Sequence, residues 1–204
     1  MIIFHKPLIV PKGFFKKRKV DGVNADGCEI LVSRIVNNMK GGQEIIRGNA
    51  LKKEPDYLIN GEWVEVTYAE RKAQKTMVEE GIFTEERDLN DILKSLAKAV
   101  DIKANKTYSV DEYSVAILSL DYCPSMYKDV GNELLDAMAS RYVNDFYKQL
   151  TSRYIDSGKL KNIYFIFIDD DYKFAFVDIN DLIKNDNSIM CIEYEDKTGI
   201  PYLE

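Results

Sequence analysis

Histidine is almost absent from this chain: His5 is the only one among 204 residues. A Ser-His-Asp triad and histidine-rich metal sites elsewhere in the sequence are therefore nearly excluded. The three cysteines, Cys28, Cys123 and Cys191, are an odd number at irregular spacing. That pattern argues against a disulfide framework or a zinc site and is typical of a reducing compartment, so we expect a cytoplasmic protein.

Long apolar runs are also lacking, and none approaches the roughly 20 residues that a membrane-spanning helix needs. The apolar start, residues 1–10, is interrupted at positions 5–7. It has no basic stretch before the apolar residues and no small-residue cleavage site, so it is a poor signal peptide. The sequence therefore predicts no membrane association.

Charge is distributed unevenly, with a net +5 over residues 1–75 and a net −11 over residues 76–204. A basic N-terminal third suits phosphate groups, whereas the acidic remainder repels them. We expect a basic arm over residues 1–24, followed by a single domain over residues 25–204. The arm contains a cluster of basic residues, Lys16, Lys17, Arg18 and Lys19. This cluster is either part of a solvated loop or a set of contacts to phosphate groups.

Apolar spacing predicts a helix, a strand, a hairpin, a second helix, a buried strand, a long helix and a second hairpin. The expected ranges are, in that order, 25–39, 44–48, 56–68, 89–100, 113–120, 130–156 and 163–179. The strand at 113–120 is nearly all apolar, which indicates burial on both faces and at least one parallel pairing. The alternation predicts an α/β (α+β) fold with a mixed β-sheet flanked by helices.

The first hairpin carries the main chemical signal. Its turn is Asn60-Gly61, so paired residue numbers sum to 121 and Asp56 falls opposite Glu65. Side chains alternate across a strand, which puts Val64 and Val66 toward the core and leaves Glu65 on a less apolar face.

Two carboxylates in direct opposition are destabilising unless a positive charge neutralises them. Mg²⁺ or Mn²⁺ would do so, because both ions prefer hard oxygen ligands and are often held by one or two carboxylates. The alternative is a solvent-facing hairpin in which Asp56 caps the turn and Glu65 pairs with a lysine such as Lys53.

The segment EPDYLINGEWVEVTY, residues 54–68, resembles the core of the PD-(D/E)xK nuclease superfamily. In that superfamily a Pro-Asp pair in one strand precedes an acid-x-lysine strand; Pro55-Asp56 matches the first part and Glu65-Val66-Thr67 the second. Within that superfamily, the segment most resembles the tRNase-type toxin domains of contact-dependent growth inhibition systems. The resemblance covers residues 25–120 and implies a restriction-endonuclease-like fold.

The resemblance also implies a metal site, in which Asp56, Glu65 and the carbonyl of Val66 hold Mg²⁺ or Mn²⁺. A helix before the hairpin usually supplies another glutamate, and Glu29 is placed to do so. A glutamate in the first turn of a helix has a second explanation, since the helix dipole favours it there by roughly 0.3–1 kcal/mol.

The sequence departs from the motif at Thr67, where the superfamily has a lysine that positions the attacking water. Lys72 and Lys75 in the following segment are candidates to replace that lysine, with Thr67 orienting the water.

These expectations favour a metal-dependent phosphodiesterase that cleaves DNA or RNA, with nucleic acid as the partner. An inhibitor or immunity protein is a further partner that the resemblance suggests. A second hypothesis is a catalytically degenerate nuclease-fold protein, of phage or mobile-element origin, that binds nucleic acid or a protein. A third is a metal-independent, barnase-like toxin RNase, against which the scarcity of histidine weighs.

Overall fold

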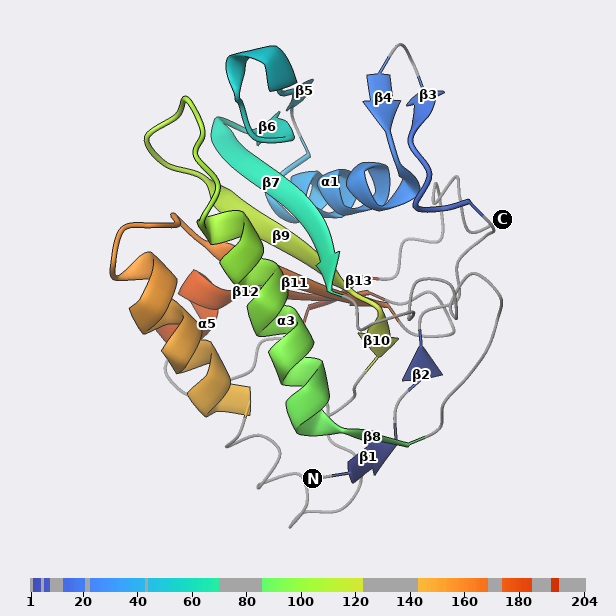
Figure 1. The fold of residues 1–204 in the computed structure, drawn as a ribbon, viewed down its shortest axis with the longest axis vertical. Helices are drawn as coiled ribbons and strands as arrows, with labels where there is room; N and C mark the ends of the chain where they lie inside the picture. Colours follow the sequence, from blue (N-terminus) through green and yellow to red (C-terminus); the bar gives the residue numbers. More distant parts are fainter. Residues whose placement is uncertain are drawn as a thin grey trace.

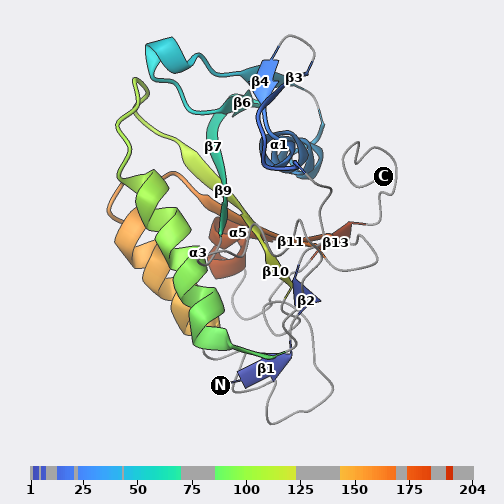
Figure 2. The same cartoon turned by 45° about the vertical axis from the view of Figure 1, so that its right-hand side comes forward.

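A mixed seven-stranded β-sheet organises the part of the chain that the computed structural model describes (Figure 1). Its strand order is β13-β12-β11-β9-β7-β6-β5. Helix α1 lies on one face of the sheet, while α3 and a helical segment at 143–155 lie on the other (Figure 2). The described residues are 2–4, 6–7, 13–20, 23–42, 44–69, 86–122, 143–168, 174–184 and 192–194.

The sheet strands are β5 (Ile45–Arg47), β6 (Tyr57–Ile59), β7 (Glu62–Ala69), β9 (Ser114–Ser119), β11 (Ile163–Ile168), β12 (Phe174–Asp178) and β13 (Ile192–Tyr194). The helices are α1 (Gly27–Met39), α3 (Leu89–Ala104) and α5 (Ile179–Lys184), with a 3₁₀ turn η1 (Ala50–Lys52) and a π turn η3 (Thr151–Ile155). Three short antiparallel pairs lie outside the sheet: β1 (Ile2–Phe4) with β8 (Glu86–Asp88), β2 (Lys6–Pro7) with β10 (Asp121–Tyr122), and β3 (Arg18–Val20) with β4 (Val23–Ala25).

The coarse fold prediction is confirmed: a mixed sheet is flanked by helices. Strand β9 runs parallel to both β7 and β11, and all six of its residues are buried, as its apolar run predicted. Helix α1 begins where expected because the side chain of Asp26 accepts a hydrogen bond from the backbone of Glu29. The long helix expected over 130–156 is seen from residue 143, and its first part lies outside the described residues.

Two hydrophobic clusters fill the space on the two faces of the sheet. Successive residues of β9 alternate between them, with Val115 and Ile117 on the α3 side and Ala116 and Leu118 on the α1 side. In β7, Val64 and Val66 face the α1 cluster, as predicted.

The opposite face of β7 differs from the prediction. We expected that face to be less apolar, but α3 covers it: Trp63 packs against the α3 cluster and Glu65 is only 2% exposed. The alternation within β7 correctly predicts which residues share a face of the strand. The burial of the second face was missed because the helix that covers it is distant in the sequence.

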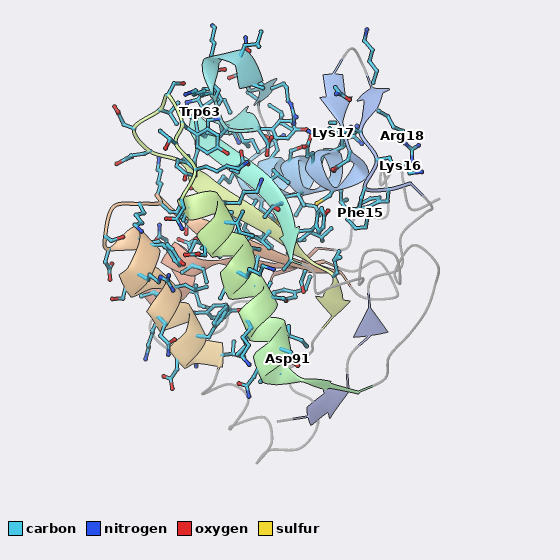
Figure 3. The ribbon with its side chains drawn as sticks, viewed as in Figure 1. Phe15, Lys16, Lys17, Arg18, Trp63 and Asp91 are labelled. Carbon is cyan, nitrogen blue, oxygen red and sulfur yellow. The ribbon has the colours of Figure 1, made fainter. Side chains whose placement is uncertain are left out.

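The basic segment ahead of α1 is anchored to the core. Phe14 and Phe15 belong to the α1-side cluster, and the N–H of Gly27 donates to the carbonyl of Phe14 over 2.7 Å. A Cβ at Gly27 would lie 2.5 Å from the Phe14 ring, so only glycine permits this contact. Residues 16–19 project from the anchored loop and are exposed; Figure 3 shows three of them beside α1. The domain boundary at residue 24 stays a prediction. No helix within the described ranges is long and apolar enough to span a membrane.

Candidate functional site

The predicted register of the first hairpin is confirmed. Strands β6 and β7 pair Tyr57 with Val64, and the next residues outward are Asp56 and Glu65. Asp56 lies one residue before β6 begins. The turn residues Asn60 and Gly61 have φ angles of 48° and 78°, the left-handed values that a two-residue hairpin turn requires.

The two acids are interlocked through backbone hydrogen bonds. The N–H of Asp56 donates to Oε2 of Glu65 over 3.3 Å, and the N–H of Val66 donates to Oδ2 of Asp56 over 2.9 Å. Each carboxylate is therefore held by the backbone of the other strand. This arrangement orients the pair independently of solvent.

A glycine at the end of β5 sets the position of Asp56. The N–H of Gly48 donates to the carbonyl of Asp56 over 2.9 Å. A Cβ at position 48 would lie 1.8 Å from the carbonyl oxygen of Pro55, closer than any packing allows. The Pro55-Asp56 backbone consequently reaches its place against β5 only because residue 48 has no side chain.

Glu65 is paired with two lysines of the α3 region. Lys103 Nζ lies 2.6 Å and Lys106 Nζ 2.8 Å from the same oxygen, Oε1. Burial by itself raises the pKa of Glu65, but the two ammonium groups outweigh it and lower the pKa to about 2. The alternative interpretation is right that Glu65 pairs with lysine, but Glu65 is buried and its partners are Lys103 and Lys106, not Lys53.

Asp56 has the opposite electrostatic character. Burial, and after it the negative charge of Glu65, raises the pKa of Asp56 to about 6 despite the hydrogen bond from Val66. Arg47 Nη2 lies 3.8 Å from Asp56 Oδ1. Two neighbouring carboxylates with pKa values pushed apart are typical of functional sites.

Glu29 occupies the first turn of α1, as predicted, but it meets the acid pair only through Arg47. The same Nη2 of Arg47 lies 2.8 Å from Glu29 Oε2 and 3.8 Å from Asp56 Oδ1. On its other oxygen, Glu29 pairs with Lys17 over 3.3 Å. This second contact connects the basic loop to the acidic site.

The donor atoms suit a divalent ion that keeps part of its water. Asp56 Oδ1 lies 3.8 Å from Arg47, and Glu65 Oε2 accepts the 3.3 Å hydrogen bond from Asp56, so each oxygen keeps lone pairs that these contacts do not use. Mg²⁺ is often bound by one or two carboxylates together with water and substrate phosphate, so this oxygen pair fits Mg²⁺ or Mn²⁺. Within the described ranges, no group of three or more His, Cys, Asp or Glu residues could hold a metal by itself. Coordination by Glu29 or by the Val66 carbonyl stays a prediction.

Thr67 lies next to this site, on the same face of β7 as Glu65. It lines a pocket of about 220 Å³ between β7 and α3, together with Ser95, Ala99 and Ile102 of the helix. Lys72 and Lys75, the predicted replacements for the motif lysine, lie outside the described residues.

Three cations of the site were missed from the sequence: Arg47, Lys103 and Lys106. The position of Lys103 could have been predicted from the sequence. Lys103 follows Ala99 by four residues and Val100 by three, which puts it on the buried stripe of its helix. A lysine on such a stripe indicates a buried anion as its partner. Arg47 gives no such signal, since its role depends on the β5–β6 pairing.

No family model matches the chain, and no curated protein or solved structure matches it significantly. The function is therefore argued from the geometry of the acid pair and its cations.

Proposed function

We propose that the protein is a metal-dependent phosphodiesterase that cleaves nucleic acid at the Asp56–Glu65 site. The observation that carries this proposal is the interlocked acid pair with Lys103 held 2.6 Å from one of its oxygens. Two acids and a lysine are the elements of the superfamily motif that the sequence resembles. In this chain the lysine would come from a helix instead of from the acid-bearing strand.

The arrangement of the surrounding elements supports the same proposal. Helix α1 is followed by the antiparallel strands β5, β6 and β7, then by α3, and then by β9 parallel to β7. This order agrees with the restriction-endonuclease-like core that the resemblance implies. The acids lie at the open end of the β6–β7 hairpin, and Lys103 reaches Glu65 from the last turn of α3.

In this proposal, the carboxylates of Asp56 and Glu65 would hold Mg²⁺ or Mn²⁺. A bound divalent ion supplies positive charge for the phosphate and acidifies water near it. Lys103 keeps a second positive charge beside Glu65. It would take the role of the motif lysine, whose position in the strand is occupied by Thr67 in this chain. Preorganised cations of this kind stabilise the charge that develops on the phosphate in the transition state.

The exposed basic loop would hold the substrate strand. Lys17 contacts Glu29, so the loop lies next to the acid pair, and a strand crossing the site would pass along it. Contacts of lysine and arginine to phosphates are independent of sequence and weaken with salt. The candidates are Lys16, Lys17, Arg18 and Lys19.

Asp56→Asn is the variant that tests the proposal most cleanly. The charge of Asp56 is unfavourable in the folded protein, so its removal preserves the fold, whereas Glu65→Gln breaks a buried ion pair. We expect purified wild-type protein to cleave RNA or DNA with Mg²⁺ or Mn²⁺, and we expect EDTA or Asp56→Asn to abolish cleavage. Lys94→Met, an exposed change on α3, is the matched control and should cleave normally.

Undiminished cleavage in EDTA would contradict a metal-dependent mechanism and favour the metal-independent RNase. The degenerate binding protein is the second candidate, because protein cations already offset the acids: Arg47 lies beside Glu29 and Asp56, and two lysines neutralise Glu65. Nucleic-acid binding without cleavage under any of these conditions would favour that candidate.

A further inference from the structure

Two lysines share one oxygen of Glu65 but occupy different environments. Lys103 belongs to the last turn of α3 and its side chain is 15% exposed. Lys106 lies beyond the end of that helix and its side chain is 45% exposed. One lysine is thus built into the helix–sheet interface, and the other reaches the acid from the protein surface.

The charge balance around Glu65 does not need both lysines once a divalent ion is present. Without the ion, two ammonium groups converge on a carboxylate whose neighbour, Asp56, carries its own negative charge. An ion held by Asp56 and Glu65 would add two positive charges to this cluster. Repulsion among these cations would then displace the lysine whose ammonium group is most easily hydrated. That lysine is Lys106, the more exposed of the two.

We propose that Lys106 is an exchangeable counterion, a role that rests on the proposed phosphodiesterase function. Lys106 neutralises Glu65 when no divalent ion is bound. When the ion binds, the ammonium of Lys106 turns outward and contacts a phosphate of the nucleic acid. Lys103 stays on Glu65 throughout.

The local geometry allows this movement to involve the side chain of Lys106 alone. Its backbone N–H donates to the carbonyl of Lys103 over 3.1 Å, and the Tyr113 hydroxyl, which donates to that same carbonyl over 2.8 Å, lies 3.4 Å from the carbonyl of Lys106. The ammonium also lies 5.9 Å from the centre of the Tyr108 ring, so an aromatic face is close to it while it contacts Glu65. The backbone therefore stays in place while the side chain rotates.

The first test measures ion binding without any turnover. Trp63 is the only tryptophan and shares a strand face with Glu65, two residues away, so Mn²⁺ at the site should quench its fluorescence. Lys106→Met removes the competing cation and retains most of the apolar stem. We expect it to bind Mn²⁺ roughly 1.5- to 5-fold more tightly than wild type, the range that corresponds to about 0.2–1 kcal/mol for a partly exposed ion pair. Lys94→Met, at the other end of α3 near Asp91 (Figure 3), should bind like wild type.

The second test measures the salt dependence of binding to a short RNA or DNA duplex. With Ca²⁺ as the probe ion, Lys106→Met should lower the slope of log affinity against log salt by about 0.7–0.9, the value of one phosphate contact. With EDTA the slope should be unchanged, because Lys106 is then engaged by Glu65. Lys106→Gln should repeat both results, which separates the loss of charge from the loss of packing.

The outcomes distinguish this inference from the function on which it rests. Two outcomes would contradict the exchange of Lys106 and leave the phosphodiesterase proposal standing. In the first, wild type binds Mn²⁺ but Lys106→Met binds it no more tightly. In the second, the salt slope of Lys106→Met changes equally in Ca²⁺ and in EDTA. If neither protein binds Mn²⁺, both proposals are wrong.

Discussion

The two carboxylates of the site should respond to neutralisation in opposite directions. Replacing Glu65 with Gln removes an anion that the fold stabilises, whereas replacing Asp56 with Asn removes an anion that the fold destabilises. Both substitutions preserve size, and each replaces one acceptor oxygen with an amide NH2 donor, so charge and one hydrogen-bonding group change together in both variants. We therefore expect Glu65→Gln to lower the free energy of unfolding at neutral pH and Asp56→Asn to raise it.

The magnitudes follow from the pKa values. The pKa of Glu65 falls from an ordinary 4.5 to about 2, which corresponds to about 3 kcal/mol of stability lost in Glu65→Gln. The pKa of Asp56 rises from 3.8 to about 6, and its side chain is 20% exposed, so solvent screening reduces the expected gain in Asp56→Asn to about 1–2 kcal/mol.

The pH dependence has a defined sign for each group. A raised pKa favours the folded state at low pH, so the contribution of Asp56 is lost as pH rises from about 4 through about 6. A lowered pKa has the reverse effect, so the contribution of Glu65 is complete above pH 4.5 and is lost as pH falls toward about 2. The gain from Asp56→Asn should consequently be larger at pH 8 than at pH 5.

Urea denaturation followed by Trp63 fluorescence, at pH 5 and pH 8, measures both variants against wild type. Equal destabilisation by Asp56→Asn and Glu65→Gln at pH 8 would refute the electrostatic reasoning. So would an effect of Asp56→Asn that is the same at both pH values.

Three other predictions concern the surroundings of the acid pair. Gly48→Ala should cost roughly 1–3 kcal/mol and weaken Mn²⁺ binding, because the added methyl displaces the Pro55-Asp56 backbone; Leu51→Ala in the adjoining exposed turn should leave urea stability within about 0.5 kcal/mol. Lys103→Met should reduce cleavage by about 10²–10³ while nucleic-acid affinity in Ca²⁺ changes little, and a loss confined to affinity would contradict its catalytic role. Lys19→Ala should lower the salt slope of nucleic-acid binding by about 0.7–0.9, measured by fluorescence anisotropy, and an unchanged slope would identify Lys19 as a solvated residue without phosphate contact.

The acid pair was predictable because its determinants are local. Asn60-Gly61 dictates a two-residue turn, the turn dictates the register, and the register brings Asp56 to Glu65 within a stretch of ten residues. Local apolar spacing likewise predicted a helix over 25–39, and α1 begins two residues later, at Gly27.

The counterions were not predictable in the same way, because they arrive through tertiary packing. Lys103 lies 38 residues from Glu65, and its contact depends on how α3 crosses β7. Arg47 is a neighbour of the site only because β5 pairs with β6, an edge pairing that the sequence of β5 does not specify. The burial of Glu65 was underestimated for the same reason. The alternation of side chains along a strand shows which residues share a face, but it does not show which element covers that face.

The contact between Gly48 and Asp56 has a consequence for how this protein can change over evolution. It closes residues 49–55 into a loop whose base is fixed by main-chain bonds and whose tip, at Leu51, is 96% exposed. Lengthening or replacing the tip of this loop, residues 50–52, would leave Asp56 where it is, because the base of the loop is closed and added loop length costs little entropy. The loop beside the site is therefore a position where new substrate contacts could be grafted without rebuilding the chemistry.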